Sequence, residues 1–435
     1  MKIFVIGQCT LHWGRMEYGN IGNYYVIEPF FRELHRVFPD AVITTTFQMS
    51  SGFQKREKVS CVPMNYYYSW TETDLGEAYQ EYTIASIYNE TGTLIGRTGF
   101  IDEVLQSDLV IDFSGDIWGK NANLVGPNRF LIGLLKDRVV QLLKKPIAML
   151  AGSPGPFDEN ELLPLAKLVF SNFNLVTNRE PVSRIVLKDF GFDVSGRVYD
   201  LACPAFLFEP ASKEKLASVL KGTVLENKQK PVIGFVLCGW NLLKGPFSRT
   251  DWDDCEFDYY VDLLTHMVQD YDVDVCLMSH SNGFILPPHF QLIHGRDYPI
   301  VQKIYDLLKK SSISNSIFML DGIYSPAETK GIISQFDMLI TGRVHAAVAA
   351  LSQAVPTTII DYGHEPKAHK LRGFAQVAGV EQYVADPSSR KDLFQKVDAC
   401  WNRRQDIHDF LVDRNKQIAE DVKKNFDLLR TLTIC

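Results

Sequence analysis

Several chemical signatures are missing from this sequence of 435 residues. Its eight cysteines are scattered, without a CxxC pair or a Cys/His cluster at zinc spacing, so neither a disulfide framework nor a structural metal is expected. No apolar run approaches the ~18 residues of a membrane-spanning helix. No carboxylate cluster suggests a metal site, and a Walker A motif and a G-x-S-x-G elbow are absent. These absences speak against zinc proteins, membrane-spanning proteins, P-loop nucleotidases and hydrolases with that elbow.

Positive charge is also scarce. The chain has 45 Lys and Arg against 52 Asp and Glu, a net charge of −7. A protein that coats nucleic acid would be basic, so no nucleic-acid partner is expected, although a local basic pocket for a small anion stays compatible. Cysteines inside apolar runs are typical of reduced, buried thiols, which favours a cytoplasmic protein. The first run, KIFVIG, indicates a β-strand rather than a signal peptide.

Short apolar runs alternate with helix-like segments along most of the chain, which is too long for one ordinary core. Continuous apolar strands with helices between them are typical of parallel sheets covered on both faces. The expected fold class is therefore α/β, with two doubly wound, Rossmann-like domains. The pattern breaks over residues 208–230, a charged stretch followed by Pro231. We expect domains at residues 1–210 and 228–385, and a helical segment at 388–435 that packs across both.

Ten runs predict the strands of the two sheets. They are KIFVIG, AVITTTF, SDLVIDFSG, PIAMLAGS and FNLVTNRE in the first half, and KPVIGFVLCG, VDVCLMSH, SIFMLDG, DMLITG and TTIIDYG in the second. Helix-like segments between them include NYYVIEPFFRELHRVF, RFLIGLLKDRVVQLLKK, PVSRIVLKDFGF and PIVQKIYDLLKKS. Residues 62–100 fit this alternation poorly, and we interpret them as an insertion near the cleft between the domains.

The run FDMLITGRVH places Arg343 and His345 where a predicted strand leads into a helix. In open parallel sheets, ligands bind beyond the carboxyl ends of the strands. A cation in the first turn of a helix is locally unfavourable, because the free N–H groups and the helix dipole already attract anions. An anionic ligand would explain the two residues. An internal ion pair of Arg343 beside a core histidine would explain them equally well, and both interpretations stay open.

Other polar residues follow predicted strands in the same way, and each has a plainer alternative. Arg179 in TNREP could bind an anion or form a surface pair with Glu180. Ser153 lies in AGSPGPF, a loop that lets backbone approach a ligand or makes an ordinary tight turn. Asp116 in FSGDIWG could be a general base or a helix cap. Lys367 in GHEPK follows the TTIIDYG strand, where a lysine is usually solvated.

Two further loops complete the set of strand ends. The loop YGNIGNYY, with Asn20 and Asn23, lacks the full G-x-G-x-x-G spacing, so a dinucleotide site is not favoured. The loop SHSNG, with His280, follows the VDVCLM run.

The order of these motifs resembles the polysaccharide pyruvyl transferase family over residues 18–380. YGNIGNYYVIEPF matches the family's first loop, and SDLVIDFSGDIWG its strand and Gly-Gly turn, with Ser114 in place of one glycine. GSPGPF and REPVSRIVLKDFGF match its Pro-Gly loop and arginine segment. GRVHAAVAALSQAVPTTIIDYGHEPKAHKLRGF matches its C-terminal motif, with Thr-Gly-Arg where Ser-Arg is usual.

The resemblance implies a fold, a reaction and a donor site. The fold would be two Rossmann-like domains facing across a cleft, as in GT-B-type glycosyltransferases, with the acceptor side in the first domain and the donor side in the second. The reaction would move pyruvate from phosphoenolpyruvate onto two hydroxyls of a sugar as a ketal. By position, Arg179, Arg343, His345 and Lys367 fall on the family's donor-binding residues.

Holding the dianionic donor takes several cations, of which Arg pairs bidentately and Lys acts as a point charge. His345 is interpreted as the general acid or as a phosphate ligand, since the pKa range of histidine suits both roles. Asp116 or Glu17 would take the hydroxyl proton. The catalytic candidates are thus His345, Arg343 and Asp116, and the substrate-binding candidates are Arg179, Lys367, Asn20, Asn23, Ser153 and His280.

The expected partners are phosphoenolpyruvate and a saccharide acceptor, with no cofactor and no metal. Because the acceptor can be lipid-linked, a peripheral contact with the inner face of the membrane stays open. Two other functions stay open as well. One is a glycosyltransferase of the same architecture that uses a nucleotide sugar, for which Asp361 or Glu365 could bind the ribose hydroxyls. The other is a non-catalytic sugar-binding relative.

Overall fold

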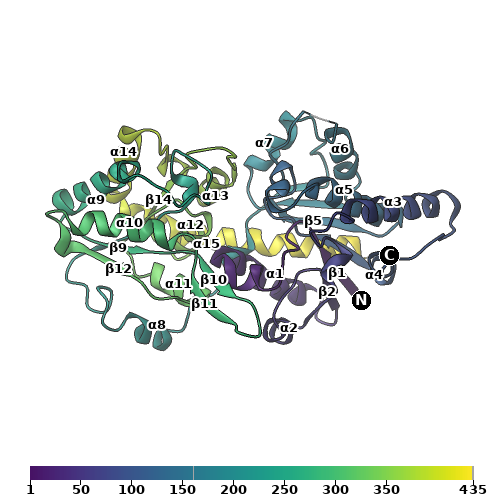
Figure 1. Cartoon of the computed structure of the whole chain (residues 1–435), viewed down its shortest axis with the longest axis horizontal. Coiled ribbons are helices and arrows are strands. Elements are labelled where there is room, and N and C mark those ends of the chain that lie inside the picture. Colours follow the sequence, from purple (N-terminus) through teal and green to yellow (C-terminus); the bar gives the residue numbers. More distant parts are fainter. Residues whose placement is uncertain (160, 434–435) are drawn as a thin grey trace. The chain divides into compact units, whose positions relative to one another are not determined.

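The computed structural model of the chain describes residues 1–159 and 161–433 (Figure 1). It divides into two compact units, and neither is one continuous stretch of sequence. The first unit comprises Met1–Met16, Ile27–Pro204 and Glu420–Cys435, and the second comprises Glu17–Val26 and Ala205–Ala419. Each unit contains one parallel sheet with helices packed on it (Figure 1).

The first unit is built on a seven-stranded sheet of order β3-β2-β1-β4-β5-β6-β7, in which every neighbouring pair is parallel. The central strands are buried at every position because both faces of the sheet are covered, which explains why they are continuous apolar runs. The strands are β1 (Lys2–Ile6), β2 (Val42–Thr45), β3 (Val59–Cys61), β4 (Leu109–Asp112), β5 (Ile147–Gly152), β6 (Leu175–Asn178) and β7 (Val198–Asp200).

Helices of the first half of the chain follow the strands in alternation. They are α1 (Ile21–Val37), α2 (Ser51–Glu57), α3 (Asp74–Thr91), α4 (Gly99–Gln106), α5 (Arg129–Leu142), α6 (Leu163–Ser171) and α7 (Val182–Asp189). Residues 62–100, which fit the expected alternation poorly, contain α3 between irregular segments. This helix packs along α5, where the buried ion pair between Glu81 and Lys136 joins the two helices.

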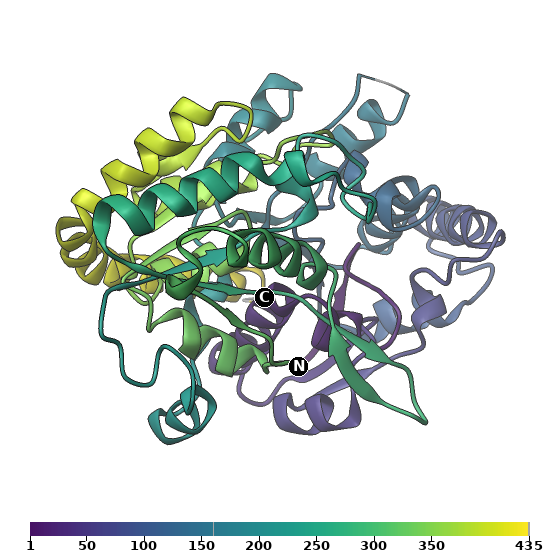
Figure 2. The ribbon, with the colours of Figure 1, turned by 60° about the vertical axis from the view of Figure 1, so that its left-hand side comes forward.

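The second unit contains a six-stranded parallel sheet of order β12-β9-β8-β13-β14-β15. Its strands are β8 (Val232–Val236), β9 (Asp274–Met278), β12 (Ile317–Leu320), β13 (Met338–Thr341), β14 (Thr357–Ile360) and β15 (Val384–Ala385). Between β9 and β12 the chain makes a separate antiparallel hairpin of β10 (Asn282–Ile285) and β11 (Gln291–His294), visible as a two-stranded ribbon in Figure 2. This hairpin was not predicted from the sequence, and neither were the short edge strands β3, β7 and β15.

The remaining helices cover the second sheet and end the chain. They are α8 (Lys213–Leu220), α9 (Asp258–Tyr271), α10 (Tyr298–Lys309), α11 (Pro326–Ile333), α12 (Val344–Leu351), α13 (Lys370–Ala378), α14 (Arg390–Asn402) and α15 (Arg404–Asp427). The last turns of α15 belong to the first unit. There Asn425 donates a hydrogen bond from Nδ2 to the carbonyl of Ala202 at 2.9 Å, and Phe426 packs on Phe30.

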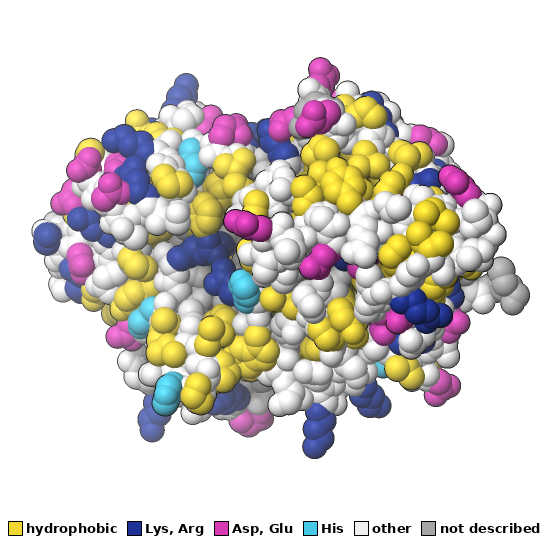
Figure 3. Space-filling view, turned by 45° about the vertical axis from the view of Figure 1, so that its right-hand side comes forward, with side chains coloured by type: hydrophobic (Ala, Val, Ile, Leu, Met, Phe, Trp, Pro, Cys, Tyr) yellow, Lys and Arg dark blue, Asp and Glu magenta, His cyan; other side chains and the backbone are white. Residues whose placement is uncertain are grey.

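The cysteines and the surface charges fit the composition. Cys203, Cys238, Cys276 and Cys400 are buried, and Cys435 lies outside the described residues. On the face drawn in Figure 3, basic and acidic side chains are interspersed with hydrophobic ones.

Among the described residues, no helix has both the length and the apolar character needed to cross a membrane.

Candidate functional site

Seven of the nine predicted site residues follow strands of their own unit, at the carboxyl ends of those strands, and the other two, Asn20 and Asn23, lie at the start of α1. In the first unit, Asp116 follows β4, Ser153 follows β5 and Arg179 follows β6. In the second unit the corresponding residues are His280 after β9, Arg343 and His345 after β13, and Lys367 after β14. All strands of a parallel sheet have their carboxyl ends on the same side, so each set of residues lies along the carboxyl-terminal side of its own sheet.

The three predicted residues of the first unit form one cluster around Arg179. Its Nε donates to the Ser153 hydroxyl at 3.0 Å, and its Nη2 lies 3.4 Å from Oδ1 of Asp116. The backbone supports this arrangement, since the N–H of Ser153 donates to the carbonyl of Gly115 at 2.7 Å. Gly115 has a φ of 60°, which favours glycine, and a Cβ there would lie 3.5 Å from Sγ of Cys9. The structure therefore holds the Arg179 guanidinium between a hydroxyl and a carboxylate.

Burial and charge set the protonation of this cluster. Burial acts to lower the pKa of Arg179, but Cys203, followed by Asp116, raises it overall. Burial, followed by the charge of Asp116, raises the pKa of the Cys9 thiol to about 12, so the thiol stays protonated. Arg179 and Glu180 are both buried, so neither belongs to a surface pair, and the Glu180 carboxylate accepts hydrogen bonds from Ser183.

A buried pair of carboxyl groups, Asp112 and Asp137, lies behind this cluster and was not found from the sequence. Ser114, the residue that replaces a glycine of the family motif, donates its hydroxyl to Oδ2 of Asp112 at 2.9 Å and accepts the N–H of Gln8 at 2.9 Å. Trp118 donates to Oδ2 of Asp137 at 3.2 Å. Burial raises the pKa of Asp112 to about 7, and burial and Asp112 raise that of Asp137 well above its ordinary value. Two adjacent buried carboxyl groups cannot both ionise, so the pair holds a proton.

In the second unit Arg343 forms a two-point ion pair with Asp297. Nε of Arg343 lies 2.8 Å from Oδ2 of Asp297, and Nη2 contacts Oδ1. Asp297 has no exposed surface, and its backbone N–H donates to the hydroxyl of Ser281 at 3.1 Å. Burial acts to lower the pKa of Arg343, but Asp297 raises it overall, so the guanidinium stays charged. Of the two interpretations left open by the sequence, the internal ion pair is therefore present.

His280, which follows β9, is fully buried near Arg343. Its ring meets that of Tyr25 edge-on, with centroids 5.5 Å apart. Burial, followed by the charge of Arg343, lowers the pKa of His280 to about 3, so the imidazole is neutral. Neither of its ring nitrogens has a hydrogen-bond partner among the described residues. Since buried polar groups are normally paired, this imidazole is suited to a ligand hydrogen bond.

The N-termini of helices α1 and α12 meet at His345. A Cβ on Gly22, in the first turn of α1, would lie only 2.4 Å from Nδ1 of His345, so only glycine allows this approach. Oδ1 of Asn20 accepts the Gly22 N–H at 3.0 Å, and the backbone of Asn20 pairs with that of Ser281. Asn23 donates its backbone N–H to the Asn20 carbonyl at 2.9 Å. The structure thus joins the first loop to the β13 end within the second unit.

Lys367 lies on the loop after β14 and is exposed. Its backbone N–H donates to Oε2 of Glu365 at 2.8 Å. Its charge acts on Asp386, whose pKa is lowered mainly by hydrogen bonds from Ser388 and further by Lys367. Lys367 is thus near enough to Asp386 to act on its charge.

Asn241 is a residue of the site that was not predicted from the sequence. Its Nδ2 lies 3.3 Å from the carbonyl of Gly342, 3.1 Å from that of Ile360 and 3.2 Å from that of Asp361, and its Oδ1 accepts the N–H of Cys238. One amide therefore ties together the ends of β8, β13 and β14 directly before Arg343. The signal available was the asparagine of CGWN, shortly after the end of the β8 strand.

Aromatic rings pack against one another between the same loops. Trp240 stacks on Phe247 with centroids 4.4 Å apart, and on Tyr362 and His364 with centroids 5.3 Å apart in each case. The Arg296 guanidinium lies over Phe247. These contacts join the loop after β8 to the loop after β14.

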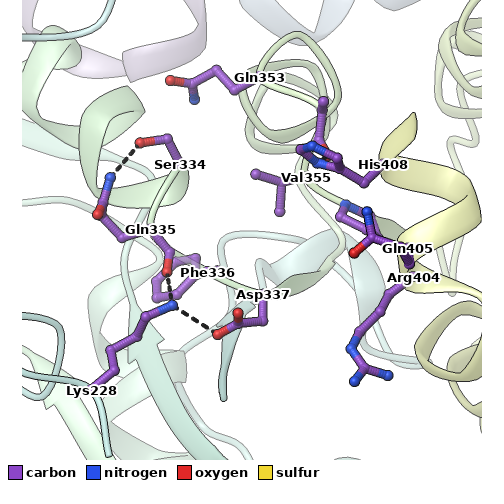
Figure 4. Close-up of a pocket in the computed structure, with 12 residues that line it drawn as sticks. Lys228, Ser334, Gln335, Phe336, Asp337, Gln353, Val355, Arg404, Gln405 and His408 are labelled. Carbon is purple, nitrogen blue, oxygen red and sulfur yellow. Dashed lines mark hydrogen bonds and ion pairs between the residues drawn. The ribbon is translucent and has the colours of Figure 1, made fainter. Parts of the chain in front are cut away.

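A hollow of about 330 Å³ lies at the opposite edge of the second sheet, before the strands begin (Figure 4). Nζ of Lys228 is bound there by Oδ2 of Asp337 and by the carbonyl of Gln335, each at 2.9 Å. Arg404 and His408 also line it. Because ligands of open parallel sheets bind at the carboxyl ends, this hollow is not the candidate site. In residues 1–159 and 161–433, no group of three His, Cys, Asp or Glu side chains could hold a metal ion.

Comparison with known proteins places the chain among carbohydrate-modifying enzymes. The model of the family described as polysaccharide pyruvyl transferase matches residues 20–364. The amylovoran biosynthesis protein AmsJ of Erwinia amylovora is 33% identical over 312 residues, which cover 71% of this chain and 69% of AmsJ.

Solved structures share the fold at low sequence identity. A glycosyltransferase from Rickettsia africae has a TM-score of 0.58 at 11% identity, over 100% of this chain and 98% of that one. The UDP-GlcNAc 2-epimerase of Methanocaldococcus jannaschii has a TM-score of 0.56 at 15% identity, over 100% of both chains. Anabaena HepE in complex with UDP has a TM-score of 0.56 at 11% identity, over 100% of this chain and 99% of that one. The expected α/β fold of GT-B-like kind is confirmed.

Proposed function

Because the chain belongs to the polysaccharide pyruvyl transferase family, we propose that it moves pyruvate from phosphoenolpyruvate onto two hydroxyls of a saccharide as a ketal. Its family and its likeness to AmsJ make it a polysaccharide-modifying transferase. The donor, the ketal product and the residue roles are the finer part of the proposal.

The observation that carries the donor assignment is the meeting of two helix N-termini at His345. The first turns of α1 and α12 each lie at the positive end of a helix dipole, which favours a phosphate or a carboxylate. Arg343 stands at the start of α12. An arginine has five N–H donors, of which the contact with Asp297 uses two. This combination supports a small dianion such as phosphoenolpyruvate better than a neutral ligand.

The proposed roles follow from the protonation states. Arg343 stays charged and binds an acidic group of the donor. His280 stays neutral, so it contributes a hydrogen bond and no charge. In the first unit, Arg179 is held in place by Ser153 and Asp116 and is proposed to bind an anionic group of a substrate. Asn20 and Asn23 shape the first loop, and Lys367 remains a proposed ligand on an exposed loop.

The reaction begins when an acid protonates the methylene carbon of phosphoenolpyruvate, which leaves a cationic centre at C2. One sugar hydroxyl attacks C2, the C–O bond to phosphate breaks, and a second hydroxyl closes the ketal. The two hydroxyl protons balance the proton on the new methyl group and the proton carried away by the phosphate. His345 acts as the acid or as a phosphate ligand, and Asp116 or Glu17 takes a hydroxyl proton. No cofactor takes part.

A second candidate is transfer of a sugar from a nucleotide sugar. It is favoured by the likeness to HepE, which was solved in complex with UDP, and that likeness concerns the fold alone. Of the carboxylates expected to bind a ribose, Asp361 is engaged by Nε of Arg372 at 2.9 Å, and Glu365 accepts the N–H of Lys367. A non-catalytic sugar-binding role is the third alternative.

Calorimetric titration of the purified protein tests the proposal. Phosphoenolpyruvate should bind, and Arg343→Lys should weaken binding about tenfold or more, because lysine keeps the charge but loses the bidentate fork. Arg390→Lys, at an exposed pair with Asp262, is the matched control and should bind normally. With a panel of saccharides, mass spectrometry should detect pyruvylated product. Absence of a response to phosphoenolpyruvate together with clear binding of a UDP-sugar would favour the second candidate.

A further inference from the structure

A pocket of about 260 Å³ lies in the second unit beside the loop that follows β8. It is lined by this loop, by the start of α9 and by Pro387. Ligand pockets for drug-sized molecules have roughly 300–1,000 Å³. This pocket is therefore of a size for one ring rather than for a nucleotide.

Apolar and aromatic side chains form part of the pocket wall and remain accessible. Leu243 is 49% exposed and Tyr259 is 39% exposed, and both line the pocket with Pro387. Lys244 and Glu256 line it as well and supply polar groups. An aromatic ring next to a few polar groups fits the two surfaces of a pyranose, which has C–H groups on its faces and hydroxyls at its edge.

Glu256 is the unusual member of this wall. Its Oε1 accepts hydrogen bonds from Nη2 of Arg249 and from the N–H of Asp253. Its Oε2 has no hydrogen-bond partner among the described residues, although the side chain is only 8% exposed. A buried carboxylate oxygen without a donor is unfavourable. A ligand hydroxyl would satisfy it.

The pocket is joined to the Arg343 site by Asn241, which lines the pocket and also binds the carbonyl of Gly342. Tyr260, on the pocket side, donates its hydroxyl to the carbonyl of Asn241 at 2.9 Å. A ring held in this pocket would therefore lie next to the loop that positions Arg343.

We propose that this pocket binds one uncharged sugar ring of the saccharide acceptor, with Glu256 accepting a hydroxyl and Tyr259 packing on a face of the ring. The assignment rests on the proposed function only in calling the bound sugar an acceptor. Sugar binding itself can be measured without phosphoenolpyruvate. It adds a saccharide subsite to the second unit, where the sequence predicted only the donor.

Cys255 provides a direct readout, because its exposed thiol lines the pocket. The purified chain is treated with limiting N-ethylmaleimide in the presence of D-glucose, D-galactose or D-mannose, with sorbitol at equal concentration as the open-chain control. Peptide mass spectrometry then follows labelling of Cys255 and of the half-buried Cys61. A hexose at ten times its Kd should slow labelling of Cys255 about tenfold. Labelling of Cys61 should not change.

Two variants make the readout specific. Glu256→Gln should abolish the protection, as should Tyr259→Ala if the first variant fails to fold. Tyr79→Ala, a similarly exposed tyrosine on α3, is the matched control and should leave protection intact. The proposal is overturned if no hexose slows labelling of Cys255, if sorbitol protects equally, or if protection survives in folded Glu256→Gln or Tyr259→Ala protein.

The test separates the two proposals. Pyruvyl transfer without protection of Cys255 would overturn the pocket assignment and leave the proposed function in place. Protection without binding of phosphoenolpyruvate would overturn the proposed donor and leave the pocket as a sugar site.

Discussion

Arg343 and Asp297 form a two-point ion pair between residues 46 positions apart in the chain. The carboxylate is completely buried, and only 13% of the arginine side chain is exposed. The pair fixes the guanidinium at the start of α12, in the position from which a ligand at the helix N-terminus would be bound. An internal ion pair and an anion site are therefore compatible, although the sequence presented them as alternatives.

Removal of Asp297 should be strongly destabilising. Asp297→Ala leaves a buried guanidinium without its counterion, and we expect the free energy of unfolding to fall by about 3–5 kcal/mol. The double variant with Asp297→Asn and Arg343→Met should lose less than the sum of the single changes, because neither charge is then left alone. Urea unfolding measures these values. Asp413→Ala, at an exposed pair with Lys416 on α15, is the control and should be nearly neutral. Equal effects of the two alanine variants would contradict the role of the buried pair.

Gly22 should not tolerate even one added methyl group. In Gly22→Ala the new Cβ would lie 2.4 Å from Nδ1 of His345, so the α1 and α12 ends must separate. We expect a loss of about 1–3 kcal/mol in stability and a weaker affinity for phosphoenolpyruvate. Gly76→Ala, on the exposed face of α3 with no atom within 4 Å of the new Cβ, should instead stabilise by up to ~1 kcal/mol. The prediction would be wrong if thermal unfolding and calorimetry gave both variants the same stability and the same affinity for phosphoenolpyruvate.

Asn241 is expected to act as a positioning residue. Asn241→Ala removes the amide that binds the carbonyls of Gly342, after β13, and of Ile360, at the end of β14. We expect the free energy of unfolding to fall by about 1–3 kcal/mol. Because Arg343 follows Gly342 directly, affinity for phosphoenolpyruvate should fall too. Gln353→Ala, beyond the far end of α12, removes an amide that binds the carbonyls of Lys330 on α11 and Ala349 on α12, and it should lower stability without affecting this affinity. A loss of affinity in both variants, or in neither, would argue against positioning by Asn241.

The carboxyl pair of Asp112 and Asp137 predicts a pH dependence of stability. The folded state raises the pKa of Asp112 from 3.8 to about 7, so it binds a proton that the unfolded chain releases. The resulting stabilisation is complete below pH ~4 and is lost as the pH rises toward 7, at about 1.4 kcal/mol per pH unit for one proton. Asp112→Asn should flatten this part of the stability profile, measured by urea unfolding between pH 4 and 8. Asp102→Asn, at an exposed pair with Arg97, should leave the slope unchanged. An unchanged slope in Asp112→Asn would refute the shared proton.

Local sequence patterns were sufficient to predict the strands that are buried on both faces. β1, β4, β5, β8, β9 and β13 are uninterrupted apolar runs, because both faces of each sheet are covered. The short edge strand β15 has two residues, too few for a period to appear. The hairpin of β10 and β11 contains two adjacent prolines, which weaken a strand signal.

The candidate site was predictable only in part, because its partners meet through the fold. Loop position at strand ends was enough to select Arg179, Ser153 and Asp116, which do form one cluster. It could not reveal that Asp297 neutralises Arg343, since the aspartate precedes α10 far away in sequence. Asp112 was missed because an aspartate at the end of an apolar strand gives no sign of the second carboxyl group, which comes from α5.

The last turns of α15 have a consequence for the order in which the chain folds during its synthesis. Asn425 and Phe426 are fully buried in the first unit, against Ala202 and Phe30. Domains usually fold as they leave the ribosome, N-terminal first. Here the first sheet can form early, but it stays open on one side until nearly the whole chain has emerged. A stop codon before Glu420 would therefore expose the core of the unit that is synthesised first.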